Sequence, residues 1–296
     1  MRLDLARVTP LVRAALREDA GRGDVTSRVL LPSATRARAV IITQESGCIA
    51  GVPVARLAFQ LFDPSLRCRV LEPEGRCVVS QTPVLRIEGR LRSILGAERT
   101  AINLLSHLSG IATLTREFVR RVQGTRAIIL DTRKTVPGLR YLEKYAVRQG
   151  GGVNHRAHLG EMVLIKSRHL DALDTLAHPM PVAYHHLSDA LIHAAVQRAR
   201  RRAPTHRIQI EVRNLREFVA ALEARPDLIL LDNMSLTEIT QAVRLRRARR
   251  SRIPLEVSGR VNVQTVRAQA LTGVERISVG ALTDSARWLD FALRLT

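Results

Sequence analysis

The sequence predicts an α/β protein with a small N-terminal part and a larger part in which strands and helices alternate. Over the first hundred residues, short β-rich runs are separated by glycine and proline and accompanied by helical stripes, which is typical of a small sheet packed with helices. From residue 127 onward six short apolar strands alternate with helices. This alternation requires parallel pairing, because each crossover returns to the same end of the sheet.

In the N-terminal part, residues 7–18 place apolar side chains on one helical stripe that a glycine-rich turn ends. The β-rich runs follow, and helical spacing then returns in two segments. The expected strands are 38–44, 66–71 and 84–88, and the expected later helices are 93–108 and 111–122.

The alternating part fits both an open doubly wound sheet and a βα barrel. Its expected strands are 127–131, 162–166, 208–212, 228–232, 254–258 and 276–280, with helices near 138–149, 187–202, 214–224, 235–249 and 263–271. The strands end at Asp131, Lys166, Glu211, Asp232, Ser258 and Gly280. In a barrel such ends converge on one rim, where barrel enzymes carry their chemistry. We therefore favour a βα barrel, incomplete because only six strands build it.

Length and composition exclude several classes of protein. The chain has 296 residues, and 47 basic against 27 acidic side chains give a net charge of +20. No apolar run reaches the roughly 18 residues that a membrane helix needs, and the N-terminus lacks the features of a signal peptide, so we expect a cytoplasmic protein that does not bind membranes. The odd number and the spacing of Cys48, Cys68 and Cys77 argue against a disulfide framework or a zinc site, and we expect small buried hydrophobes.

The positive charge does not by itself predict nucleic-acid binding. Only three of the 47 basic residues are lysine, a bias that indicates coding drift, and aromatic residues make up only 3%. We interpret the clusters at 198–202 and 244–252 as solvated helix faces. A basic nucleic-acid-binding protein is kept as the alternative from another functional class.

Basic residues concentrate at the predicted rim. The segment 131–135, Asp-Thr-Arg-Lys-Thr, follows the first barrel strand, and 150–156, Gly-Gly-Gly-Val-Asn-His-Arg, precedes the second. Together with the second strand they bring five potential cations to one opening: Arg133, Lys134, His155, Arg156 and Lys166. Such a cluster would repel itself unless it binds a polyanion.

The remaining strand ends suit a metal and a phosphate. Glu211 and Asp232 end successive strands, and two carboxylates beside a phosphate-rich ligand are a usual site for hydrated Mg²⁺. Small residues at the last two strand ends offer backbone N–H groups to a terminal phosphate, namely Ser258, Gly259, Gly280 and Ala281. Each motif alone has a structural alternative, as a capped turn, a flexible loop or a helix cap; their combination at one rim favours a binding site.

The chain resembles the nicotinate-nucleotide pyrophosphorylase family, also called the quinolinate phosphoribosyltransferase family, over nearly its whole length. The residues that carry the resemblance are 18–19, 21–27, 97–104, 108–113, 131–135, 137–140, 144–146, 150–156, 164–166, 230–233 and 278–283. The resemblance implies a glycosyltransferase of NAD biosynthesis, which converts quinolinate and phosphoribosyl pyrophosphate to nicotinate mononucleotide, pyrophosphate and CO₂ with Mg²⁺. It also implies an N-terminal α/β sandwich at 1–110, an incomplete βα barrel at 111–280, and a segment at 281–296 that returns to the sandwich.

The resemblance also implies roles for residues and an assembly. Arg133, His155, Arg156 and Lys166 would hold the two carboxylates of quinolinate, with Arg99 delivered by the neighbouring subunit of a homodimer or hexamer. Lys134, Glu211 and Asp232 would handle phosphoribosyl pyrophosphate and its metal, so Lys134, Lys166, Glu211 and Asp232 are the expected catalytic residues. Ser258, Gly259, Gly280 and Ala281 would cradle the 5′-phosphate.

Five positions depart from the family pattern. Ser167-Arg168-His169 replaces Asp-Asn-His, Gln209 replaces a glutamate, Arg260 replaces a glycine and Asp284 replaces a histidine; the stretch around 170–186 is also longer. We expect either that Arg260 supplies the lost phosphate donor or that Asp284 pairs with Arg287. These changes keep a second alternative open, a paralogue such as the ModD-like proteins of molybdenum-transport operons with a different substrate.

Overall fold

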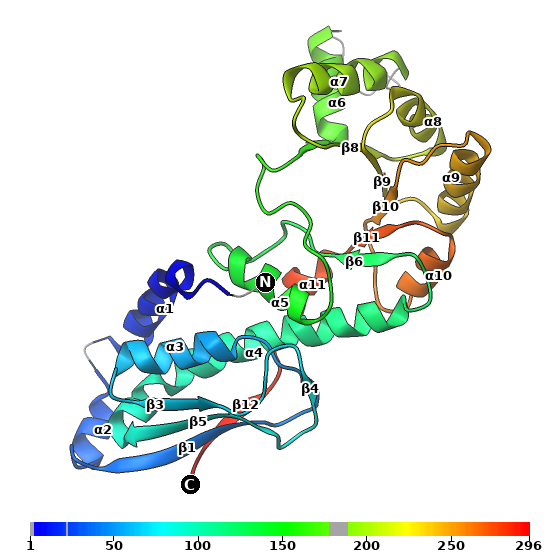
Figure 1. Ribbon diagram of the computed structural model, residues 1–296. Helices are drawn as coiled ribbons and strands as arrows, with labels where there is room; N and C mark the ends of the chain where they lie inside the picture. Colours follow the sequence, from blue (N-terminus) through cyan, green and yellow to red (C-terminus); the bar gives the residue numbers. More distant parts are fainter. Residues whose placement is uncertain (1–2, 22, 178–188) are drawn as a thin grey trace. The chain divides into compact units, whose positions relative to one another are not determined.

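The computed structural model describes residues 3–21, 23–177 and 189–296, which form two compact units (Figure 1). The first unit contains the described residues up to Glu117, together with Thr135–Gly152 and Leu282–Thr296. The second contains Phe118–Lys134 and Val153–Ala281. Within these described ranges, no helix has the length and apolar character that crossing a membrane requires.

The first unit is a four-stranded antiparallel sheet covered by helices. Its strands are β1 (Arg36–Thr43), β3 (Arg67–Val70), β5 (Pro83–Arg90) and β12 (Phe291–Leu295), in the order β12-β1-β5-β3, with a separate pair β2 (Gly47–Cys48) and β4 (Cys77–Val78). Its helices are α1 (Leu5–Ala20), α2 (Val25–Leu30), α3 (Val52–Phe62), most of α4 (Leu91–Arg121) and α5 (Arg140–Gln149). Figure 1 shows α3 and α4 on the same face of this sheet, where Ile41, Phe59 and Leu85 are fully buried.

The three strands expected in this part are confirmed as β1, β3 and β5, while the two expected helices form one. Helix α4 continues through Ser109 and Gly110 without a break. A side chain at Gly110 would collide with the backbone of Arg287, so the glycine serves close packing rather than a helix end. Helix α3 and strand β12 were not expected from periodicity; β12 pairs with β1 through Ile41 and Leu293.

The expectation that the cysteines form no disulfide is wrong for one pair. Strands β2 and β4 place Cys48 opposite Cys77 in antiparallel register, with the two Cα atoms 4.1 Å apart, and the side chains form a disulfide. Spacing along the chain does not reveal such a pairing, because the register of two short strands decides it. Cys68 is a free thiol, and burial raises its pKa to about 11.

The second unit is built on a six-stranded parallel sheet. Its strands are β6 (Ile128–Leu130), β7 (Val163–Ile165), β8 (Ile208–Val212), β9 (Leu228–Asp232), β10 (Leu255–Ser258) and β11 (Arg276–Ser278), in the order β6-β11-β10-β9-β8-β7. All six expected strands are confirmed. The order runs in one direction without the reversal that defines a doubly wound sheet, and the sheet stays open between β6 and β7. This is the incomplete barrel arrangement expected from the sequence.

Helices connect these strands and lie outside the sheet. They are α6 (Ser167–Ala177), α7 (Asp189–Arg202), α8 (Leu215–Ala224), α9 (Leu236–Ala248), α10 (Val266–Leu271) and the start of α11 (Ala281–Asp284). Figure 1 shows α8, α9 and α10 along one side of the sheet. Helix α6 was not expected, and the prolines and histidines of the long stretch at 178–188 lie outside the described residues.

Candidate active site

The carboxyl edge of the parallel sheet gathers polar side chains from neighbouring strands. In the parallel register Asp232 at the end of β9 lies beside Ser258 at the end of β10. Glu211 precedes the end of β8, and Lys166 directly follows β7. The side chains that the sequence placed at a common rim therefore come from one edge of one sheet, all within the second unit.

Lys166 and Glu211 form an ion pair at this edge. The Lys166 Nζ lies 2.9 Å from Glu211 Oε2, and the Ser167 hydroxyl donates to Glu211 Oε1 at 2.7 Å. Burial alone would raise the pKa of Glu211, but the hydrogen bonds from Ser167 and Lys166 hold it below its ordinary value. Ser167 thus belongs to the site, a role that the departure from the family pattern did not predict.

Asp232 is the more accessible carboxylate of the expected metal pair. Burial and the negative charge of Glu211 raise its pKa, whereas the charges of Lys166 and Lys134 oppose that rise. The two carboxylates therefore act on each other electrostatically, as expected of neighbours. Two carboxylates and no third protein ligand suit Mg²⁺, which keeps several waters or phosphate oxygens. Over the described residues, no group of three or more His, Cys, Asp or Glu side chains could hold a metal.

Asp131 anchors the segment that carries the next basic side chains. Its buried carboxylate accepts the Asn154 side-chain amide at 2.6 Å and the His155 backbone N–H at 2.8 Å. Val153 extends this connection, because its N–H donates to Ile129 at 2.8 Å along the end of β6. Residues 153–156 are therefore fixed against the sheet edge.

Arg156 is held in a buried position near a second arginine. It is 8% exposed, and its guanidinium Nη1 donates to the Met162 carbonyl at 3.1 Å. Burial and the positive charge of Arg133 both lower the pKa of Arg156. A buried guanidinium with a second positive charge nearby is suited to an anionic ligand, above all a carboxylate.

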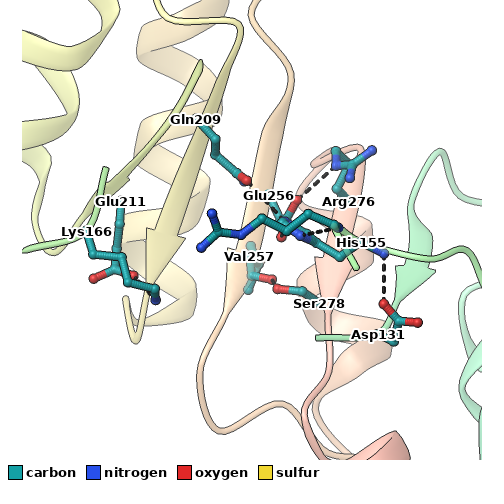
Figure 2. A network of polar contacts seen from close by, with 10 residues as sticks. Asp131, His155, Lys166, Gln209, Glu211, Glu256, Val257, Arg276 and Ser278 are labelled. Carbon is teal, nitrogen blue, oxygen red and sulfur yellow. Dashed lines mark hydrogen bonds and ion pairs between the residues drawn. The ribbon is translucent and has the colours of Figure 1, made fainter. Parts of the chain in front are cut away.

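The His155 ring lies within the barrel interior. Figure 2 shows Gln209, Glu256 and Arg276 grouped around it, apart from the Lys166–Glu211 pair. The Nε2 atom lies 3.1 Å from Gln209 Oε1 and 3.3 Å from Glu256 Oε1, while Nδ1 accepts the Arg156 backbone N–H at 2.8 Å. Glu256 and Arg276 are functional candidates that the sequence analysis missed. The available signal was a charged residue inside a buried strand, with an arginine at the matching position of the next strand.

The expected phosphate end is formed by small residues after β10 and β11. Gly259 has a φ of +88°, and any side chain there would collide with Asn233, so this turn requires glycine. Arg260 follows with a φ of +35° and is exposed. Gly280 and Ala281 follow β11 in partly exposed positions.

The alternative in which Asp284 pairs with Arg287 is wrong. The Arg287 guanidinium lies 3.0 Å from Glu45 Oε2, and Asp284 instead accepts the neighbouring Ser285 hydroxyl. Arg99, which the resemblance assigns to a neighbouring subunit's site, lies exposed on α4 in the first unit.

The glycine run at 150–152 serves packing within the first unit. A Cβ at Gly150 would lie 2.5 Å from the Ala112 carbonyl oxygen, and one at Gly152 would lie 2.8 Å from Thr115 Cγ2. Both contacts are with α4, so the close approach that the glycines permit is between two segments of the chain. A flexible loop is not needed to explain them.

The fold and site define an enzyme with an incomplete βα barrel whose rim is equipped for an acidic substrate and a phosphate-bearing donor, the features of a phosphoribosyltransferase. Residues 24–109 match the quinolinate phosphoribosyl transferase N-terminal domain, and residues 111–294 match the C-terminal domain of the same family. The chain belongs to the quinolinate phosphoribosyl transferase family.

Individual relatives are similar to this chain over nearly their whole length. The nicotinate-nucleotide pyrophosphorylase [carboxylating] of Mycobacterium leprae is 42% identical, with 99% of this chain and 98% of the relative covered. A probable enzyme of the same name from Synechocystis is 38% identical, covering 97% of this chain and 92% of the relative. The solved structure of NadC from Streptococcus pyogenes superposes with a TM-score of 0.89 at 35% identity, covering 100% of this chain and 99% of that one.

Proposed function

We propose that this protein is a carboxylating nicotinate-nucleotide pyrophosphorylase, which transfers phosphoribosyl from phosphoribosyl pyrophosphate to quinolinate with loss of CO₂. One observation carries the proposal. Arg156 is buried, burial and the charge of Arg133 lower its pKa, and it lies in a family-specific segment beside the strand-end carboxylates. Relatives with this name cover the whole chain.

The proposed chemistry needs no nucleophile from the protein. The quinolinate ring nitrogen attacks C1′ of the ribose as the C1′–O bond to pyrophosphate breaks, through an oxocarbenium-like transition state. The C–C bond to the 2-carboxylate then breaks, its electron pair stays on the ring carbon beside the cationic nitrogen, and that carbon takes a proton from water. Positioning of both substrates and stabilisation of the leaving group therefore account for catalysis.

Each basic or acidic side chain has a proposed task in these steps. Arg133, His155, Arg156 and Lys166 orient the quinolinate carboxylates, with Arg99 supplied by a second copy of the chain. Lys134 stabilises the leaving pyrophosphate, and Ser258, Gly259, Gly280 and Ala281 hold the 5′-phosphate. Glu211 and Asp232 would hold Mg²⁺, whose chemistry when bound is neutralisation of charge on the pyrophosphate.

The turnover test uses purified protein with Mg²⁺, phosphoribosyl pyrophosphate and quinolinate labelled in its 2-carboxylate. Labelled CO₂ and nicotinate mononucleotide should appear in equal amounts, and Arg133→Ala or Lys166→Ala should abolish both. Arg201→Ala, an exposed arginine on α7, is the matched control and should retain activity. Absence of turnover with wild type, combined with salt-sensitive retention on heparin, would favour the nucleic-acid alternative.

The proposed assembly is a homodimer or a multiple of it with shared active sites. Arg99→Ala and Lys166→Ala should each be inactive, because each lacks one half of the site. Mixing the two variants under exchange conditions should restore roughly a quarter of wild-type activity, since half of the dimers are then mixed and each has one intact site. No recovery despite subunit exchange would contradict the sharing. The cytoplasmic location stays a prediction.

A further inference from the structure

Glu143 on α5 is a buried carboxylate to which the proposed chemistry gives no task. Its side chain is fully buried, so it cannot contact a substrate. Burying a carboxylate is costly unless hydrogen bonds or opposite charges compensate for the lost water. The groups that compensate here are therefore the best indication of what the carboxylate does.

Glu143 links helix α4 to the loop that precedes α5. Its Oε1 atom lies 2.9 Å from His107 Nε2 on α4. The backbone N–H of Val136 donates to both carboxylate oxygens, at 3.4 Å to Oε1 and 3.3 Å to Oε2. A single side chain on α5 thus accepts from a helix and from the loop, and it fixes the loop against both.

The loop residues that α5 holds come directly after Lys134, the side chain proposed to stabilise the leaving pyrophosphate. Val136 is two residues further along the chain, and the Thr135 hydroxyl between them accepts the Arg140 Nε at 2.9 Å. On the other side, the Lys134 N–H donates to the Thr132 hydroxyl at 3.0 Å. The backbone of Lys134 is therefore held both before and after it.

His107 is itself held in place. Trp288 lies against the His107 ring, edge to face, with the ring centroids 5.9 Å apart. Only 12% of the His107 side chain is exposed. The ring therefore has little freedom to turn away from Glu143, and the carboxylate faces a fixed partner.

We propose that Glu143, with His107, is a positioning residue of the active site. It fixes the backbone that follows Lys134 and thereby directs the Lys134 side chain toward the leaving pyrophosphate. Glu143 acts through this backbone and does not touch a substrate. The link from Lys134 to pyrophosphate rests on the proposed function, whereas the hold of Glu143 on the loop does not.

Hydrogen exchange of the substrate-free protein measures the hold on the loop. Glu143→Met keeps the size of the side chain but removes both acceptor oxygens, so the Val136 amide should exchange about 10-fold or more faster than in wild type. The matched control is Glu275→Met. Glu275 also accepts one side chain, Arg246 at 2.7 Å, and one backbone N–H, that of Leu255 at 2.9 Å, but it precedes β11 at the amino edge of the sheet. The control should leave the exchange of Val136 unchanged.

Steady-state kinetics measures the effect on Lys134. In Glu143→Met we expect kcat to fall by about 10-fold or more, because a displaced Lys134 stabilises the leaving group less well. The quinolinate KM should stay within about 3-fold of wild type, since Arg156 and Lys166 lie on other segments. Glu275→Met should leave both constants unchanged even if its Tm falls, which separates a positioning role from a loss of stability.

A wild-type kcat in folded Glu143→Met would refute the positioning role, and a wild-type exchange rate of Val136 would refute the hold on the loop. If that variant does not fold, His107→Ala is compared with His107→Gln, which retains a donor for the carboxylate. The kcat of His107→Gln should be about 5-fold or more above that of His107→Ala, and equal values would refute the role. Absence of turnover by wild type would refute the proposed function instead, and the exchange rates would still decide whether Glu143 holds the loop.

Discussion

Asp131→Asn tests how strongly one buried carboxylate holds the segment that carries the substrate-binding side chains. The carboxylate is fully buried and accepts the Asn154 amide at 2.6 Å and the His155 N–H at 2.8 Å. The variant replaces one acceptor oxygen by an NH₂ group, which leaves a buried donor facing another donor. A hydrogen bond to a charged group contributes about 1.5–3 kcal/mol, and a buried donor without a partner costs about 1–3 kcal/mol.

We therefore expect Asp131→Asn to lose about 2–4 kcal/mol of unfolding free energy and about 5–10 °C in Tm. The assay is thermal denaturation followed by circular dichroism, with quinolinate kinetics below the transition. We expect kcat/KM for quinolinate to fall by about 100-fold, because displacement of the segment by about 1 Å is sufficient for such a loss. Asp189→Asn is the control: its ion pair with Arg216, 3.3 Å long, is exposed and should contribute less than about 1 kcal/mol. A Tm within 1 °C of wild type for Asp131→Asn would refute this reasoning.

Three further predictions concern pH, backbone conformation and the first unit. Burial would raise the pKa of Glu256, but the hydrogen bonds and positive charges of His155 and Arg276 outweigh it and hold that pKa at about 2. Since that pKa lies below the ordinary 4.5, Glu256 stabilises the fold by about 3 kcal/mol above pH 4.5 and loses this as the pH falls toward 2. Urea unfolding should therefore show that the difference in unfolding free energy between wild type and Glu256→Gln becomes smaller as the pH falls from 4.5 toward 2. A difference that does not change with pH would contradict this prediction. Arg260→Gly should raise the KM for phosphoribosyl pyrophosphate without lowering Tm, because glycine tolerates the φ of +35° better than arginine; an unchanged KM would show that Arg260 does not replace the lost donor. Burial already raises the pKa of Glu74, and Tyr145→Phe removes the hydroxyl that donates to its Oε2 at 2.6 Å. The variant should lose about 1–3 kcal/mol when Glu74 is charged and less as it is protonated, so an equal loss at pH 7 and pH 4 would contradict the assignment.

The sequence predicted the strands of the second unit because each is a short apolar run bounded by polar or small residues. β8 shows the pattern clearly: every residue from Ile208 to Val212 is buried, and a carboxylate stands near its end. The position of a residue along a strand determines the edge at which it emerges, so Lys166, Glu211 and Asp232 could be placed at one edge in advance.

The partners of these side chains could not be predicted, because they depend on the register of neighbouring strands and on which side chains point into the barrel. Glu256 lies beside Arg276 only because β10 and β11 pair in that register. The same limit explains the Cys48–Cys77 disulfide, which two very short strands create. Linear spacing carries no information on either contact.

The structure was also needed to decide between the alternatives for the phosphate end of the site. Because Asp284 would repel a phosphate, the sequence suggested that Asp284 pairs with Arg287, three residues away. Arg287 instead pairs with Glu45, which is far from Arg287 in the chain. Long arginine side chains reach many carboxylates, and tertiary packing selects among them.

The most direct test of the central claim is the affinity for quinolinate compared with nicotinate, which lacks the 2-carboxylate. Titration calorimetry of the wild-type protein measures both. If Arg133, Arg156 and Lys166 grip two carboxylates, the loss of one charged contact of about 2 kcal/mol weakens binding about 30-fold. We expect quinolinate to bind at least that much more tightly than nicotinate. Equal affinity for the two acids would contradict the account.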